Sequence, residues 1–437
     1  MLHKRTIIKV LILLSLLYIV SCHCNNTQKK VIEDDASLIS LKDKLIVLEN
    51  DNLEIIDTIR ISQFSDSLFY ILLERTEQCK ISNIEKVLMT DSLIFVLDIN
   101  ESLFSFDRTG KFLRKISSDC WGFDILEDSK LMFIAKRRKI DIYDFSGERV
   151  HQSVRLGPEL EGIGNFFAAI DSNTVAISIW NQGIEDNRLV IMSTDGNTLE
   201  SFPNPEKFNS TSSPLISMAA RHFNQTVSRF NNKVYYHPYY SDTLFLLSEN
   251  KLEPIFIEKK IPKVPLEHRL EYTGNEKVFG DYCINNEKYT TRIFNSKRFY
   301  LVIYNLGQIS MTLPNYLLYD KITETTYNYK QNLNFITGIL HYGFYNDYDG
   351  GLAFNPSFFL DEFLIEAHNP LNFKNYYLNG RYIQDCDKNG ICTTNHYQIK
   401  SDYCEHPERK TILENFIRLI REDSNPVLII ARLKGIN

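Results

Sequence analysis

The sequence predicts an all-β protein, a β-propeller with one short helix near its C-terminus. Short runs of β-branched and aromatic residues are separated by Gly, Asp and Asn, which is typical of strands joined by tight turns. Groups of these runs recur along the chain, and one stretch near the end has apolar residues at helical spacing. Small sheets of this kind bury their two apolar faces when they stack in a ring.

The N-terminus predicts export and lipid attachment. A basic start is followed by the apolar run 10–20, which is typical of a secretory signal and short for a membrane span. The run ends in Ile19-Val20-Ser21-Cys22, which resembles the lipobox of bacterial lipoproteins. We therefore predict a signal peptide over residues 1–21 and acylation of Cys22, which anchors the protein in a membrane. A plain secretory signal and an uncleaved anchor helix are the alternatives.

The region behind the lipid site predicts a tether. Residues 22–36 are polar and short, as in flexible linkers. The 8 cysteines of the chain are too few for a dense disulfide framework. Cys386 and Cys392 are close enough in sequence to pair across a turn, with Cys404 as a competitor.

The overall composition is that of a globular chain with a full core. Of the 437 residues, 43% are hydrophobic and 24% are charged, which excludes extended disorder and collagen-like fibres. The formal net charge of -6 gives no electrostatic attraction to nucleic acid or to an anionic membrane surface. We therefore expect no nucleic-acid partner, and contact with the membrane through the lipid anchor.

The body, predicted over residues 37–437, begins as a β-meander. The runs 91–98, 103–107 and 112–116 have strand composition, and Gly110 in the last turn can adopt a positive φ at little steric cost. Similar groups follow at 131–150, 174–202, 233–257 and 298–329. Units of four short antiparallel strands that recur at about this spacing are typical of a β-propeller. A β-sandwich with a second domain is the alternative.

The C-terminal stretch breaks the strand pattern. Pro407 suits the first turn of a helix, and the apolar residues within 412–420 mark one face. Asn425 and the proline after it end this helix, and the apolar run 427–433 is predicted as a strand. We expect this last strand to join a blade shared with residues near the N-terminus, which would close the ring.

Several stretches together resemble the six-bladed β-propeller lipoproteins of Gram-negative anaerobes. The matching stretches are 91–116, 240–244, 319–321, 346–351 and 422–428. The resemblance implies six blades and a place in the cell envelope, but no reaction. The tether is compatible with the inner membrane, the outer membrane or the cell surface, and we expect the outer membrane. The chain departs from the family pattern at 117–122, where a Gly-Pro-Gly-type connection is usual.

No nucleophile elbow, phosphate loop, dinucleotide fingerprint or paired-histidine helix occurs in the sequence. The stretch 346–351 places Asp347 and Asp349 beside two glycines, and such hard oxygens could hold Ca²⁺. We favour a tight turn, in which Asn and Asp bond to their own backbone. The two carboxylates remain candidate binding residues at the mouth of the ring.

A second acidic stretch offers weak metal ligands. Asp385, Asp387 and Asn389 occupy positions 1, 3 and 5 of a calcium loop. His396 stands at the twelfth position in place of a bidentate Glu, and no predicted helices flank the stretch. We therefore favour a solvated hairpin tip and predict no metal site and no cofactor.

A cluster of aromatic residues offers a candidate binding patch. Tyr236, His237 and Tyr239 lie in one short aromatic run that could be partly exposed and stack on a sugar ring. Packing between blades is the alternative for these side chains.

Three functions are compatible with these features. The favoured one is a non-enzymatic lipoprotein whose propeller is a binding scaffold for a glycan, peptide or protein. The alternative is a propeller hydrolase or lyase, which needs carboxylates from several blades to hold a metal at the central channel. A structural or sensory subunit of an envelope complex is the third. The fold by itself favours none of them.

Overall fold

The structure, a computed structural model, describes most of the chain after residue 44. The described residues are 45–49, 53–56, 59–151, 153–157, 160, 166–179, 186–205, 207, 226–238, 241–249, 251–259, 289–305, 315–329, 333–334, 339–340, 344–379, 381–386, 392–397 and 406–435. The predicted signal peptide over 1–21, the tether over 22–36 and the lipid site at Cys22 lie outside them.

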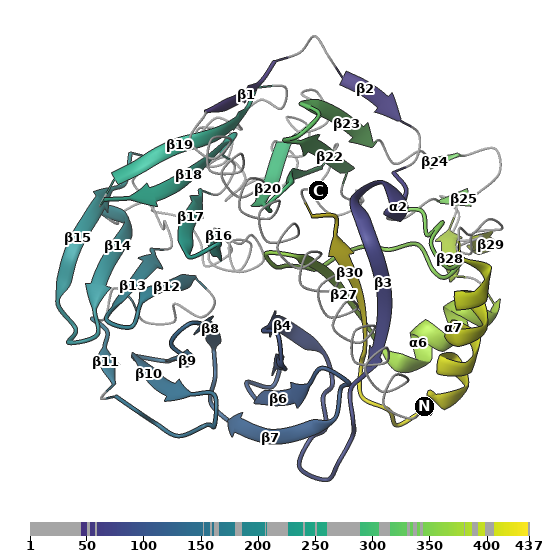
Figure 1. Cartoon of the computed structure of the whole chain (residues 1–437), viewed down its shortest axis with the longest axis horizontal. Helices are drawn as coiled ribbons and strands as arrows, with labels where there is room; N and C mark the ends of the chain where they lie inside the picture. Colours follow the sequence, from purple (N-terminus) through teal and green to yellow (C-terminus); the bar gives the residue numbers. More distant parts are fainter. Residues whose placement is uncertain are drawn as a thin grey trace, which may run out of the picture. The chain divides into compact units, whose positions relative to one another are not determined.

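Six sheets of four or five strands follow one another around an axis, so the predicted six-bladed propeller is confirmed (Figure 1). The first blade contains β4 (Ile84–Met89), β5 (Leu93–Asp98), β6 (Leu103–Asp107) and β7 (Phe112–Ser117). The second contains β8 (Gly122–Leu126), β9 (Leu131–Lys136), β10 (Lys139–Asp144) and β11 (Val154–Arg155). The third contains β12 (Phe167–Asp171), β13 (Thr174–Ser178), β14 (Asn187–Ser193) and β15 (Thr198–Pro203).

The last three blades recruit strands from the start of the chain. The fourth contains β16 (Thr226–Phe230), β17 (Lys233–His237), β18 (Thr243–Ser248), β19 (Lys251–Glu258) and β1 (Ile46–Leu48). The fifth contains β20 (Tyr289–Asn295), β21 (Phe299–Asn305), β22 (Asn315–Asp320), β23 (Thr325–Tyr329) and β2 (Leu53–Ile56). The sixth contains β26 (Phe358–Phe359), β27 (Phe363–His368), β30 (Val427–Leu433) and β3 (Ser65–Leu72).

The predicted three-strand groups are the second, third and fourth strands of the first, third, fourth and fifth blades. The innermost strand of each blade, which precedes its group, was not predicted. In the second blade the fourth strand is β11, not the expected run at 149–150. Gly110 has a φ of 88°, as expected for its turn. A Cβ atom there would lie 2.6 Å from the carbonyl oxygen of Leu72, so this turn also needs glycine to pack against the end of β3.

The last strand closes the ring, as predicted. β30 pairs antiparallel with β27 on one side and with β3 on the other, and Ile430 lies opposite both Ile365 and Phe69. Asn425, just before this strand, is fully buried. Its side chain accepts a hydrogen bond from the N–H of Ile81 at 2.9 Å and donates to the carbonyl of Glu74 at 2.9 Å. The end of the chain is therefore tied to the connection between the sixth and first blades.

Apolar and aromatic side chains fill the spaces between neighbouring blades. Between the fourth and fifth blades, Phe256 stacks on Tyr300 with ring centroids 4.4 Å apart. Between the sixth and first blades, Ile430 and Val87 belong to one buried cluster. Burial of these faces, at about 25 cal/mol per Å² of apolar surface, is the main force that holds the blades side by side.

A long insertion separates the second and third strands of the sixth blade. It contains α6 (Pro370–Asn379), the hairpin of β28 (Arg381–Cys386) and β29 (Cys392–Tyr397), and the predicted C-terminal helix α7 (Pro407–Leu419). The remaining elements are α2 (Ile61–Phe64), β24 (Leu333–Asn334) and β25 (Ile339–Leu340). The two long helices are joined by a hydrogen bond of 2.9 Å from Lys374 Nζ to the carbonyl of Ile420. Within the described residues, no helix is both long and apolar enough to span a membrane.

Candidate functional site

The two faces of the ring differ in their connections. The turn face carries the short turns between the first and second strands of the blades, such as 91–92, 127–130 and 231–232. The opposite loop face carries the connections between blades, such as 73–83 and 118–121, and those between second and third strands.

On the turn face, one turn reaches across the axis. Asn231 and Asn232 both have positive φ, 49° and 58°, and form the tight turn of the fourth blade. The N–H of Asn231 donates to Asp361 of the sixth blade at 3.0 Å, and Asn232 Nδ2 donates to Asp128 of the second blade at 2.9 Å. These two blades flank the first blade, which faces the fourth across the ring. The turn therefore bridges blades on the far side of the axis.

Further polar contacts join neighbouring turns of the same face. The N–H of Asp91 donates to Glu127 at 3.0 Å between the first and second blades. Lys297 and Glu362 form an ion pair between the fifth and sixth blades. A further contact spans the ring, because Arg229 in β16 of the fourth blade donates to the carbonyl of Ile125 in β8 of the second blade. Contacts from several blades thus fix the turn face.

Arg292 lies near the axis without an anionic partner. It is in the middle of β20, the innermost strand of the fifth blade, opposite Ile303. Its guanidinium lies 5.5 Å from the ring centre of Phe294, and within the described part of the chain no carboxylate or hydrogen-bond acceptor contacts it. Burial lowers the pKa of the partly exposed Arg292 to about 10, so it is charged at neutral pH. A desolvated charge without a partner destabilises a fold, which makes Arg292 a candidate ligand group.

His237 is the second group with an unused polar atom. It ends β17 at the loop face and is fully buried. Its Nε2 lies 2.9 Å from the carbonyl oxygen of Ser241, so this nitrogen carries the proton of the neutral ring. Burial lowers the pKa of His237 to about 4, against the carbonyl of Ser241, and the charge of Arg292 lowers it further. Nδ1 is left as an acceptor with no partner among the described atoms.

Arg188 is the third side chain with an unused polar atom. It lies near the loop-face end of β14 in the third blade. Its guanidinium packs over Tyr236 at 5.7 Å and over Phe245 at 5.4 Å. Its buried Nε has no hydrogen-bond partner among the described residues. The aromatic rings hold this guanidinium through cation–π contacts.

The aromatic run predicted as a binding patch is placed differently from expectation. Tyr236 is 1% exposed and His237 is 0% exposed, so these two side chains do not form an exposed patch. Tyr236 packs between the third and fourth blades, which is the packing alternative. Tyr239 lies outside the described residues. A role of these residues in binding stays a prediction.

The acidic stretch 346–351 forms a buried turn. Asp347 accepts hydrogen bonds from the backbone and hydroxyl of Ser62, the latter at 2.5 Å. Asp349 accepts from the N–H of Gly351 at 3.0 Å, from the Asn346 amide at 2.9 Å and from the Tyr70 hydroxyl at 3.2 Å. Their oxygens thus bond within the turn and to the strand and helix beneath it, which is the turn interpretation. Burial raises the pKa of Asp349.

Gly351 is needed where it lies. A Cβ atom at this position would be 2.6 Å from the hydroxyl oxygen of Tyr70 and 2.9 Å from Oδ1 of Asp349. No real side chain fits at such distances without a shift of these groups. The stretch is therefore a packed structural unit held against α2 and against β3 of the sixth blade.

The weak metal candidates are only partly described. Asp385 lies in β28, next to the turn of the β28–β29 hairpin, and Asp387 and Asn389 lie outside the described residues. The hairpin expected for this stretch is confirmed by its strand pairing, which places Cys386 directly opposite Cys392. Over the described ranges, no group of three His, Cys, Asp or Glu side chains is arranged to hold a metal ion.

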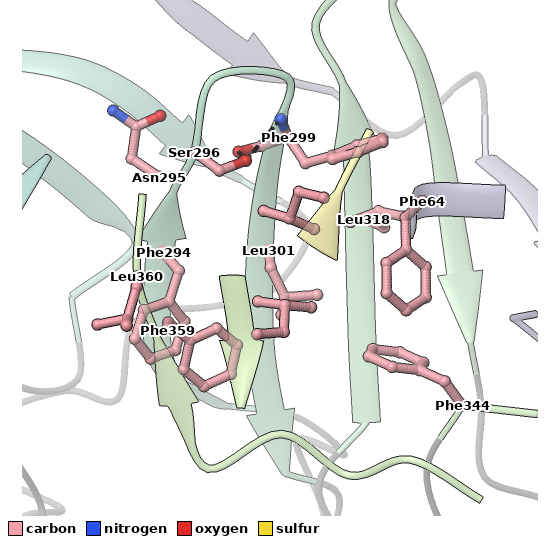
Figure 2. Close-up of a pocket in the computed structure, with 12 residues that line it drawn as sticks. Phe64, Phe294, Asn295, Ser296, Phe299, Leu301, Leu318, Phe344, Phe359 and Leu360 are labelled. Atoms are coloured by element: carbon pink, nitrogen blue, oxygen red, sulfur yellow. Dashed lines mark hydrogen bonds between the residues drawn. The ribbon is translucent and has the colours of Figure 1, made fainter. Parts of the chain in front are cut away.

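A small apolar cavity lies between the fifth and sixth blades (Figure 2). Figure 2 shows rings and aliphatic chains from both blades around it, and Phe294 and Phe359 stack with centroids 3.6 Å apart. Its volume is about 20 Å³, room for about one water molecule, and its lining offers few polar partners. This cavity is a gap in the packing and is too small for a ligand.

Sequence reasoning missed Arg292 and Arg188. Neither belongs to a motif, and each is an isolated charge within an otherwise strand-like run. Such a charge in a predicted strand is a weak signal, because the feature that singles it out is the lack of a partner in three dimensions.

Comparison with known proteins supports the fold. A family model described as "Domain of unknown function (DUF4934)" matches residues 44–432. A solved structure from Bacteroides fragilis, of a protein to which export is attributed, aligns with a TM-score of 0.61 and 16% identity, over 90% of this chain and 100% of its own. A DUF4221 family member from Bacteroides vulgatus aligns with a TM-score of 0.42 and 9% identity, over 63% and 88%. No curated protein matches the chain.

Proposed function

The chain belongs to the DUF4934 family, and from this premise we propose that it is a lipid-anchored protein of the cell envelope whose propeller binds a ligand at its loop face. In this proposal Cys22 carries the lipid, and residues 22–36 tether the propeller to the membrane, most simply the outer membrane. The similar fold of a Bacteroides protein to which export is attributed supports an extracytoplasmic location.

The observation that carries the binding role is the contrast between the two faces. The turn face is held by contacts across the axis, such as that of Asn231 with Asp361. His237, at the loop-face end of β17, has an unused polar atom, Nδ1. A rigid scaffold with polar groups of this kind is typical of a binding protein.

Lipid attachment is tested by metabolic labelling with a fatty acid and by membrane fractionation. The full-length protein should be labelled and sediment with membranes. Cys22→Ser should be unlabelled and soluble after export. Equal labelling of both proteins would contradict the lipid anchor.

The binding face is tested by blocking each face separately. Ile99 is 58% exposed where β5 ends at the loop face, and Ser92 is exposed in a turn of the turn face. Ile99→Cys and Ser92→Cys, each coupled to a polyethylene glycol maleimide, make a matched pair on one blade. Capture of glycans or envelope proteins should be lost with the first and kept with the second. The reverse pattern would contradict the proposal.

A further inference from the structure

Three like charges lie side by side on the second blade at the loop face. The turn from β9 to β10 begins at Lys136 and ends at Lys139, and these two residues are directly opposite each other in register. Arg155 of β11 is directly opposite Lys139 on its other side. Residues opposite each other in antiparallel strands point to the same face of the sheet, where like charges repel each other. Lys136, Lys139 and Arg155 thus form a cationic row across three strands.

A buried carboxylate holds part of the cationic row in place. Asp141, two residues after Lys139 on β10, is 1% exposed. Its oxygens lie 3.2 Å from Nζ of Lys136, 3.1 Å from Nζ of Lys139 and 3.2 Å from the guanidinium of Arg149. Burial raises the pKa of Asp141, but hydrogen bonds from Ser153 and the two lysines hold it below its usual range, so the carboxylate is charged. One negative charge therefore orients three cations and neutralises only one of them.

The cationic row keeps donors for a ligand. A lysine ammonium has three N–H donors, and Asp141 takes one from each of the two lysines. The guanidinium of Arg155 is exposed, and within the described residues it has no ion pair and no hydrogen bond.

Positive charge also predominates around the row. Arg137 and Arg138, in the turn itself, are exposed. Partial burial lowers the pKa of Lys136, but Asp141 and, more weakly, Asp119 of the connection 118–121 raise it above its usual range. Asp119 is thus one opposing charge beside several cations. In a chain with a net charge of -6, this concentration of positive charge is local to the second blade.

We propose that the cationic row binds a saccharide that carries several sulfate or phosphate ester groups. Neighbouring strands lie about 4.8 Å apart, so the row extends over about 10 Å, more than a single ester group covers. Successive ester groups along one saccharide chain fit such a row. The lysines meet them as point charges, and Arg155 can make a two-point contact. This inference rests on the proposed function, because it names the ligand of the same loop face.

Two observations favour a saccharide over other anions. The side chain of Lys136 is only 16% exposed, so a flat anionic bilayer does not reach its ammonium, whereas a single ester group does. The partly exposed Trp121 lies beside the row, since its backbone N–H donates to the carbonyl of Ala135 at 2.9 Å. An aromatic side chain next to cations is suited to a sugar ring that carries anionic groups, and less to an acidic peptide.

The row is next to the position that is blocked in the test of the binding face. The loop that begins at Ile99 contains Glu101, whose carbonyl accepts a hydrogen bond of 2.9 Å from the N–H of Cys120. The connection 118–121 therefore lies between this loop of the first blade and the cationic row of the second.

Calorimetric titration of the full mature protein in detergent tests the proposal. The probes are dextran sulfate and phosphorylated dextran, which tell the two ester types apart, with neutral dextran, poly-glutamate and micelles containing phosphatidylglycerol as comparisons. We expect at least one esterified dextran to bind, and the three comparison probes to bind at least tenfold more weakly. Lys139→Gln/Arg155→Gln should weaken this binding at least tenfold. Lys233→Gln/Arg418→Gln, the same change of charge on the turn face and on α7, should leave it unchanged.

The melting temperature of the unliganded protein gives a second measure. Arg155→Glu should raise it, because a like-charge pair with Lys139 becomes an opposite-charge pair in the same register, and should weaken binding at least tenfold. A structural arginine would lower the melting temperature when replaced. A lowered melting temperature, or unchanged affinity in this variant, would overturn the proposal. So would a wild-type protein that binds neither esterified dextran, or that binds poly-glutamate or the micelles as tightly.

Failure here is distinguishable from failure of the proposed function. If the block at Ile99 still abolishes capture while neither esterified dextran binds, only the ligand class is wrong. If that block leaves capture unchanged while the cationic row binds its probe, capture takes place elsewhere and the proposed function is wrong.

Discussion

Acid should destabilise this protein through one histidine, His237. Its side chain is 0% exposed and its pKa in the folded protein is about 4, below the ordinary value of 6.5. Between pH 6.5 and 4 the imidazole of His237 is therefore protonated in the unfolded chain but neutral in the folded protein. A lowered pKa of a base makes stability rise with pH, so the contribution is complete above pH 6.5 and is lost as pH falls to 4. The loss amounts to about 3 kcal/mol, at about 1.4 kcal/mol for each pH unit of the window.

The assay is chemical denaturation of the wild type and of His237→Gln at several pH values from 7.5 to 4. Glutamine keeps an N–H that can donate to the carbonyl of Ser241 but does not titrate in this range. Carboxylates common to both proteins cancel in the comparison. We expect the stability of the wild type relative to the variant to fall by about 3 kcal/mol between pH 7 and pH 4. A difference that does not change with pH would refute the reasoning.

Three further predictions concern the packing of the ring. Asn425→Ala should lower the free energy of unfolding by about 3 kcal/mol, since three hydrogen bonds to buried backbone are lost at about 1 kcal/mol each; an unchanged melting temperature would contradict this. Gly351→Ala should cost about 1–3 kcal/mol because its Cβ would meet the hydroxyl of Tyr70 at 2.6 Å, and the additional variant Tyr70→Phe should recover part of the loss in thermal melting. Cys386 and Cys392, opposite each other in the hairpin, should form a disulfide in the exported protein; peptide mass mapping without reduction should find them linked, and free alkylation of both would exclude it.

The sequence predicts the outer strands of the blades well because they are amphipathic and end at turns with strong signals. Gly110, with its positive φ, is an example. The innermost strands are harder to predict because both of their faces are covered. All five residues of β8, Gly122–Leu126, are buried, including Asp124, so the strand lacks an alternating pattern. Asp124 is satisfied there by the N–H of Ala169 in the next blade, which no local pattern reveals.

The helix α6 was missed for a related reason. Its sequence contains asparagines and aromatic residues with modest helix propensity. Packing holds it in place, since Phe373 is fully buried against Tyr70 and Phe416. Arg292 could not be predicted as a candidate for another reason. It is unusual only because no carboxylate or hydrogen-bond acceptor of the described residues contacts its guanidinium. That property belongs to the folded ring and not to any segment of the sequence.

The most direct test of the closed ring links strands from the two ends of the chain. Ser67 of β3 and Arg432 of β30 are opposite each other in register, and both are accessible. In Ser67→Cys/Arg432→Cys, mild oxidation should form an intramolecular disulfide and raise the melting temperature, because a very long loop is closed. The control pair Ser92→Cys/Arg432→Cys, in different blades, should stay reduced. Absence of the first crosslink in the folded protein would contradict closure of the ring by its last strand.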